Sequence, residues 1–302
     1  MEKNVNEAIL ETTETSAPEI KFDVKALKLE KITWIEKNII KPLFHDPLTN
    51  YILGKRSIRF LAFITRASIL KNLGGDGPGS WMSMLAHYDG KSKNWMDKFV
   101  NRANAFPMAL RNRQQLVVTI LKQLIRSFGD KQYVNLTAVG SGSGNNILKA
   151  IIESEVPVSS VKAQLFDLNE EGLAYGRHKS KELGLADSVE YLYSCATELD
   201  DKIKQAPHVV KMIGLVEYLS DEAMEKLFSS VAKFRDPSST ILISSIEQKH
   251  GIERFLNKSL NFYLNYRSPE KLKAVLKKYG YKRFDVFPEP SGVFNVLVGY
   301  TY

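Results

Sequence analysis

Cysteine is almost absent from this chain of 302 residues, because Cys195 is the only one. A single cysteine excludes an internal disulfide and agrees with a reducing compartment. Long hydrophobic runs are also missing, since no apolar stretch approaches the roughly 18 residues that a membrane-spanning helix needs. We therefore expect a protein without a membrane span.

The sequence also has no metal-ligand pattern and no signal-peptide pattern. No set of His, Cys, Asp and Glu has the spacing of a metal site, so we expect no metal. The first 20 residues contain five Glu and one Lys and have no apolar core of signal-peptide length. This composition predicts a flexible tail over residues 1–22 and a cytoplasmic protein.

Acidic residues are fewer than basic ones, 34 against 42, which gives a formal charge of +8. Such an excess invites a nucleic-acid interpretation. It is concentrated in residues 249–283, where ten Lys or Arg accompany two acids. A basic helix face favours solubility, and contact with phosphates or a membrane surface stays the alternative. Nucleic acid is therefore an unfavoured partner that the sequence does not exclude.

Residues 23–129 have helical periodicity. Apolar residues recur at i, i+3, i+4 and i+7 within 34–44, 57–73 and 110–128, which predicts a mainly helical N-terminal cap region over 23–129. A loop dense in glycine and proline lies at 74–79. It is interpreted as a lid on the substrate side or as a plain connector, with neither favoured.

After residue 129, short apolar runs alternate with amphipathic stretches, which is the pattern of βαβ units. The last two runs have only FPEPSG between them, too short for a crossover, so the last strand must be antiparallel. The prediction is an α/β domain over 130–302, with a seven-stranded, mostly parallel, doubly wound sheet and an antiparallel last strand. The expected strands are 133–140, 161–168, 189–194, 208–215, 240–246, 281–287 and 292–302, and the expected helices are 145–155, 170–184, 221–234 and 268–280.

A glycine-rich turn follows the first expected strand. Gly140, Gly142 and Gly144 precede a helix, where glycine lets a ligand approach the backbone and the helix N-terminus favours polar or negative groups. The dinucleotide fingerprint G-x-G-x-x-G does not match, because Asn145 or Ile147 stands where its last glycine should be. The phosphate-loop motif is absent too, so an NAD site and a nucleotide-triphosphate loop are disfavoured.

Asp167 ends the second expected strand, about 20 residues beyond the glycines. A carboxylate at this place can accept hydrogen bonds from a ribose diol. The alternative is an N-cap for the helix that begins at Glu170. Together, the turn and the acid predict a nucleoside site at the carboxyl edge of a parallel sheet.

These features resemble the class I S-adenosylmethionine-dependent methyltransferases over residues 130–302. The resemblance rests on the turn, Asp167, the strand pattern with its closing hairpin, and the segments GLVEYLSD (214–221) and YRSPEKL (266–272). It implies S-adenosyl-L-methionine as the cofactor. The cofactor-binding residues that it implies are Gly140, Gly142, Gly144, Asp167, Leu168, Cys195, Ala196, Gly214 and Leu215.

Two positions depart from the family pattern. The family usually has an acid two residues before the first glycine, where this chain has Ala138, and often an acid where it has Cys195. Another group must then hold the amino-acid end of the cofactor. We expect Arg113 to bind the methionine carboxylate through two hydrogen bonds, and the alternative is a surface arginine.

Candidates for the acceptor side follow from the same resemblance. A sulfonium methyl group is already activated, so the protein mainly aligns it with the acceptor, and the motifs name no general base. The family geometry puts Glu217 and Tyr218 near the methyl group, and His250 follows the fifth strand, so these three are candidates for a catalytic role. Tyr263 and Tyr266 are candidates for the wall of the acceptor site.

The favoured function is O- or N-methylation of a small-molecule acceptor, such as a specialised metabolite. A helical cap with a glycine-rich loop would shield a compact acceptor from water. The (Asn/Asp/Ser)-Pro-Pro-aromatic segment of enzymes that methylate base amines is missing after the fourth strand. RNA or protein methylation, and a cofactor-binding protein without transferase activity, stay as alternatives. A homo-oligomer is also open.

Overall fold

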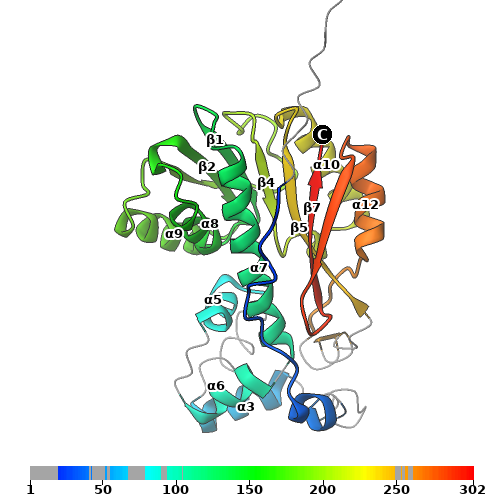
Figure 1. Ribbon diagram of the computed structural model, residues 1–302. Coiled ribbons are helices and arrows are strands. Elements are labelled where there is room, and N and C mark those ends of the chain that lie inside the picture. Colours follow the sequence, from blue (N-terminus) through cyan, green and yellow to red (C-terminus); the bar gives the residue numbers. More distant parts are fainter. Residues whose placement is uncertain are drawn as a thin grey trace, which may run out of the picture.

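The computed structural model describes residues 20–40, 42, 52, 55–66, 79–89, 94–103, 105–248, 253, 256–257 and 261–302 (Figure 1). Its centre is one seven-stranded sheet, and a group of helices lies beyond one end of the strands. No helix in the described part of the chain is long and apolar enough to cross a membrane.

The sheet has the strand order β3-β2-β1-β4-β5-β7-β6. All neighbouring strands are parallel except at β7, which runs antiparallel to both β5 and β6. The seven expected strands and the reversal of the last one are thus confirmed. The strands are β1 (Val134–Val139), β2 (Val161–Asp167), β3 (Val189–Tyr193), β4 (Val209–Met212), β5 (Thr240–Ile246), β6 (Arg283–Pro288) and β7 (Phe294–Tyr300).

Helices cover both faces of the sheet, as expected for a doubly wound domain. On one face lie α7 (Ala105–Ser127), α8 (Asn145–Glu153) and α9 (Glu170–Glu182), and on the other lie α10 (Asp221–Phe234) and α12 (Pro269–Lys278). Local chemistry sets where these helices begin. The hydroxyls of Ser220 and Ser268 accept hydrogen bonds from Ala223 and Lys271 backbone N–H groups and so cap α10 and α12.

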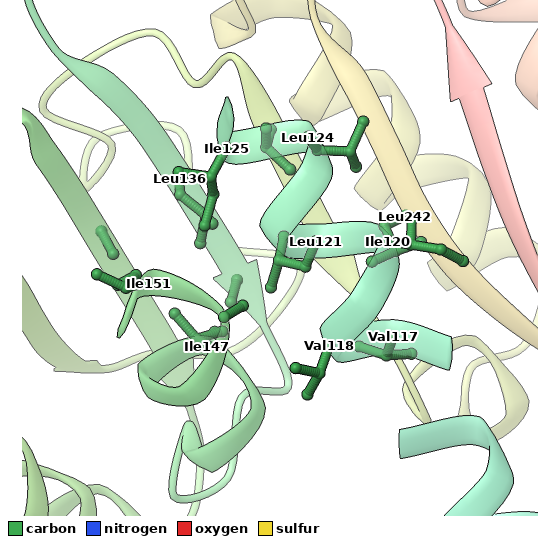
Figure 2. Packing of buried hydrophobic residues seen from close by; sticks show 14 of the residues in the cluster. Val117, Val118, Ile120, Leu121, Leu124, Ile125, Leu136, Ile147, Ile151 and Leu242 are labelled. Atoms are coloured by element: carbon green, nitrogen blue, oxygen red, sulfur yellow. The ribbon is translucent and has the colours of Figure 1, made fainter. Parts of the chain in front are cut away.

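The largest apolar cluster joins α7 to the sheet. Figure 2 shows side chains of α7, including Leu121 and Ile125, packed against Leu136 of β1, Ile147 of α8 and Leu242 of β5. All five are less than 2% exposed. Burying such side chains is the main favourable term of folding.

Helix α7 belongs to both parts of the molecule. Its C-terminal half packs on the sheet, while α5 (Trp81–Asp89) and α6 (Trp95–Ala103) contact it elsewhere, and α3 (Lys55–Thr65) lies beside them (Figure 1). The domain boundary between residues 129 and 130 stays a prediction. Phe22 falls within the expected tail but meets Phe287 of β6 edge to face at 5.3 Å, so the tail does not extend that far.

Two expected features of the cap fall partly outside the described residues. Of the segment 34–44, the structure describes a π-helical turn over Glu36–Ile40, and of the segment 57–73 it describes α3 up to Thr65. Residues 74–78 of the glycine- and proline-rich loop lie outside the described part, and Gly79 lies inside it.

Candidate functional site

A cavity of about 320 Å³ opens at the carboxyl ends of β1, β2 and β4, between the sheet and the cap. The order of strands along the sheet reverses between β1 and β4, which is where open α/β sheets bind ligands. The cavity has a polar side on the sheet and an apolar side on the cap. Its residues come from segments far apart in the sequence.

The glycine-rich turn forms the floor of the cavity. Gly140 and Gly142 line it and have φ values of 64° and 54°, in the left-handed region that favours glycine. Gly144 also has a positive φ but is not a lining residue. A Cβ on it would collide with Leu165 and approach the Tyr191 hydroxyl to 3.1 Å. Gly144 therefore serves the close packing of α8 on the sheet.

Asp167 ends β2 and turns its carboxylate towards the floor. Its Oδ2 accepts a hydrogen bond from the Gly142 N–H at 2.6 Å, and its Oδ1 accepts one from the Asn169 N–H at 2.8 Å. The N-cap of α9 is Asn169, whose Oδ1 accepts from Gly172 N–H at 2.7 Å, so the N-cap interpretation of Asp167 is wrong. A carboxylate has about four acceptor sites, so Asp167 retains capacity for a diol.

A buried hydrogen-bonded chain lies where β4 leaves the sheet. The Gly214 N–H donates to the Ser244 hydroxyl at 2.9 Å, and this hydroxyl donates to Oε1 of Glu217 at 2.7 Å. Glu217 is 3% exposed and lines the cavity. Burial raises the pKa of its carboxyl, while Arg113 and the Ser244 hydrogen bond lower it in part. Its Oε2 has no hydrogen-bond partner among the residues that the structure describes.

Arg113 lies on the cap side of this acid. It is 4% exposed, so the surface-arginine interpretation is wrong. Its Nη1 is 3.9 Å from Glu217 Oε1, its Nη2 donates to the Tyr88 hydroxyl at 3.3 Å, and its guanidinium lies 4.2 Å from the centre of the Phe294 ring. Within the described ranges its Nε has no acceptor.

The two residues before Arg113 tie the N-terminal segment to α7. Arg111 forms an ion pair with the carboxylate of Glu30, and the Asn112 side chain bonds the backbone of Glu30 in both directions, at 2.8 and 2.9 Å. Neither lines the cavity. Of this helical run, Arg113 alone is a cavity residue.

Lys211 is a cavity residue that the sequence did not single out. It stands in the middle of β4, in register with Ala138 of β1, and is 2% exposed. Burial and, to a smaller extent, the charge of Arg113 lower the pKa of its ammonium to about 8, while Asp167 acts in the opposite direction. A single lysine in the apolar run 208–215 was the available signal, since a central parallel strand is normally apolar throughout.

Aromatic side chains from both the cap and the α/β domain close the cavity. Trp81 of α5 packs on Tyr175 at 5.2 Å between ring centres and lies over the backbone of Gly142. Phe262 meets Tyr218 edge to face at 5.9 Å. Gly79 lies so close to the Tyr218 hydroxyl that a Cβ there would collide with it. The end of the glycine- and proline-rich loop therefore lies against Tyr218.

Several sequence candidates lie beside the cavity without lining it. Ser194 and Ala196 line it, but Cys195 between them turns its sulfur to the Thr197 hydroxyl, 3.3 Å away. Tyr263 is 67% exposed, and Tyr266 packs against the apolar cluster of Ile246 and Phe294 without lining the cavity itself.

The segment 261–267 is not helical, which explains the position of these tyrosines. Burial alternates along it, since residues 262 and 264 are half-buried and residue 263 is exposed. Phe262 and Leu264 consequently line the cavity, whereas Tyr263 faces away from it. His250 lies outside the described residues. The remaining candidates, Leu168, Leu215 and Tyr218, line the cavity.

Comparisons with known proteins give a fold. No family model matches the chain, and no curated protein matches its sequence. A protein from Bordetella parapertussis described as a possible exported protein has a TM-score of 0.66 at 12% identity, over 88% of this chain and 96% of that one. Magnesium protoporphyrin IX methyltransferase from Synechocystis PCC 6803, solved with bound SAH, has a TM-score of 0.54 at 12% identity, over 73% and 94%.

A further solved structure is the CMeT domain of citrinin polyketide synthase, with a TM-score of 0.54 at 14% identity, over 81% of this chain and 68% of that one. Together with the strand order, these likenesses show that the chain has the fold of class I S-adenosylmethionine-dependent methyltransferases. No three His, Cys, Asp or Glu side chains come together as metal ligands in the described part of the chain.

Proposed function

We propose that this protein is an S-adenosylmethionine-dependent methyltransferase that acts on a small-molecule acceptor. The observation that carries the proposal is the position of Glu217. Its buried Oε2 has no hydrogen-bond partner among the described side chains, and the residue lines the same cavity as the glycine-rich turn and Asp167. A nucleoside-type floor and an unpaired buried acceptor atom in one cavity suit a two-substrate transfer reaction.

The polar side of the cavity fits the cofactor. At Gly140 and Gly142 no side chain stands between the ligand and the backbone, and Asp167 retains acceptor sites for the two hydroxyls of a ribose. Ala196, Gly214 and Leu215 would border the remaining nucleoside and thioether. When bound, the cofactor supplies a methyl group activated by its sulfonium.

The apolar side of the cavity fits the acceptor. Tyr88, Phe262 and Phe294 give it aromatic walls. The whole cavity, which includes the cofactor side, has a volume of about 320 Å³, at the lower end of the range for small-molecule sites. Such walls exclude water and hold a compact, partly aromatic or aliphatic acceptor in one orientation. A polymer such as RNA or a folded protein would have to present a single protruding group.

Glu217 has the chemistry of a proton acceptor in this site. Its free Oε2 can accept a hydrogen bond from an acceptor O–H or N–H, and then the proton as the nucleophile is alkylated. Burial raises its pKa, which makes it a stronger base than an exposed carboxylate. Tyr218 does not act as the base near neutral pH, because desolvation of its hydroxyl and the nearby Glu217 raise the pKa of the phenol and keep it protonated. It can orient the acceptor by donating a hydrogen bond.

The first test is binding of S-adenosylhomocysteine, the cofactor product, by calorimetry. Wild-type protein should bind it, and Asp167→Ala should weaken binding at least about tenfold through loss of charged hydrogen bonds. Asp201→Ala is the matched control, because Asp201 is exposed and distant from the cavity residues. Absence of binding by wild-type protein would refute the proposal.

The second test identifies the acceptor class. The protein is incubated with methyl-labelled cofactor and a cell extract, which is then separated into small-molecule, RNA and protein fractions. Label in the small-molecule fraction supports the proposal. Label in RNA or protein would overturn the choice of acceptor, and binding without transfer to any fraction would favour a cofactor-binding protein without transferase activity.

A further inference from the structure

Lys211 occupies a place where a charged side chain is unusual. It lies in β4, flanked by β1 and β5, with Ala138 and Leu242 as its neighbours in register. Neighbouring residues in register point to the same face of a sheet, so Lys211 and Ala138 are side by side on the face covered by α7. Ala138 has only a methyl group, which leaves the space next to the lysine without a carboxylate.

The acids nearest to Lys211 are bound elsewhere. Asp167 accepts hydrogen bonds from two backbone N–H groups, of Gly142 and Asn169, and the Oε1 of Glu217 accepts from Ser244 and lies 3.9 Å from Arg113. No residue in the part of the chain that the structure describes forms a hydrogen bond or an ion pair with the Lys211 ammonium. The cavity therefore contains a buried cation that lacks a bonded anion.

Arg113 adds a second positive charge but is already held by other groups. The Tyr88 hydroxyl, the Phe294 ring and the Glu217 carboxylate fix its guanidinium on the cap side. Lys211 is free of such partners and lies on the sheet side, beside the first strand and its glycine-rich turn. Of the two cations, Lys211 is the one that forms no hydrogen bond or ion pair at all with the described part of the chain.

Burying a charge without a partner costs free energy, and a bound ligand of opposite charge offsets this cost. The amino-acid end of S-adenosylmethionine has both an ammonium and a carboxylate. Beside Lys211 the ammonium would be repelled and the carboxylate attracted. The family pattern has an acid at position 138, whereas this chain has the uncharged Ala138 there and the ammonium of Lys211 next to it in register.

We propose that Lys211 binds the methionine carboxylate of the cofactor, so that the amino-acid subsite of this protein has reversed polarity. The assignment rests on the proposed function and changes one expectation, since Arg113 is not the main carboxylate ligand. Its guanidinium instead holds Glu217 and the acceptor wall. A longer-range role for Arg113 is to add positive potential to the same subsite.

The test compares two ligands that differ in the amino-acid end. S-adenosylhomocysteine has it, and 5′-methylthioadenosine keeps the nucleoside and thioether but lacks the amino acid. Binding of both is measured by calorimetry at pH 7 for wild-type protein, for Lys211→Met and for Lys277→Met. Lys277 is exposed on α12 and away from the cavity, which makes the last variant a matched control for loss of one lysine.

Lys211→Met should weaken S-adenosylhomocysteine binding at least about tenfold, as for loss of one hydrogen bond to a charged group. Binding of 5′-methylthioadenosine should change less than about twofold, and Lys277→Met should match wild type for both ligands. Unchanged S-adenosylhomocysteine binding, or an equal loss for both ligands, would overturn the assignment while leaving the proposed function intact. A wild-type protein that binds neither ligand would refute the proposed function and this assignment together.

Discussion

Replacement of Lys211 by methionine should stabilise the cofactor-free protein near neutral pH. The pKa of Lys211 is about 8 in the folded protein, against 10.5 for an ordinary lysine, because burial and Arg113 disfavour its charged form. Each pKa unit corresponds to about 1.4 kcal/mol, so below pH 8 the buried charge costs about 3 kcal/mol of folding free energy. Methionine has a similar length and no charge, so the variant avoids this cost.

The pH dependence of the gain separates charge from packing. Between pH 8 and pH 10.5 the unfolded chain holds the lysine proton more tightly than the folded protein does, so wild-type stability rises with pH across this window. The gain from Lys211→Met should therefore fall from about 3 kcal/mol at pH 7 to about 1 kcal/mol at pH 9.5. Altered packing contributes equally at the two pH values and cancels in the difference.

The assay is urea-induced unfolding at pH 7 and pH 9.5, followed by circular dichroism without cofactor, with free energies from linear extrapolation. Lys277→Met, at an exposed position of α12, should change stability by less than about 0.5 kcal/mol at either pH. A gain of the same size at both pH values, or no gain at pH 7, would show that Lys211 is not a buried unpaired cation.

Two further predictions concern the acid and the turn. Glu217→Gln should slow methyl transfer about 10²- to 10⁴-fold with little change in S-adenosylhomocysteine affinity, while Glu222→Gln, at an exposed site, keeps wild-type rates. Because burial raises the pKa of Glu217, wild-type activity should fall with decreasing pH at a higher pH than for an ordinary carboxylate. Equal transfer rates for Glu217→Gln and Glu222→Gln would contradict the role of Glu217 as the base. Gly144→Ala should destabilise the protein by about 3 kcal/mol and Gly184→Ala by about 1 kcal/mol, measured by urea unfolding. Both have a φ of 71°, but only the first meets Leu165, so equal costs would argue against the close packing.

The fold was largely predictable because its signals are local. Alternation of apolar runs with amphipathic stretches is a property of short segments, and all seven strands followed from it. The antiparallel last strand followed from the length of one link, since so few residues cannot make a crossover. The cap was less predictable, because helical periodicity alone does not say which helix also packs on the sheet, as α7 does.

The site residues were predictable where they stand at the ends of expected strands. Gly140, Gly142 and Asp167 were identified from their place at strand ends, and they do line one cavity. Residues 263 and 266 were chosen for their aromatic type, but Phe262 lines the cavity instead. Side-chain direction depends on backbone conformation, and an aromatic-rich segment does not reveal it.

By itself, the sequence determined the strand pattern, the glycine-rich turn and the acids that follow it, because backbone preference and residue spacing act within a few residues. Only the tertiary structure decided the charge of the site. Lys211 and Ala138 are 73 residues apart, and their pairing in adjacent strands is what leaves the ammonium without an acid. Burial and the identity of neighbours set the energy of a charge, and both arise when distant segments pack together.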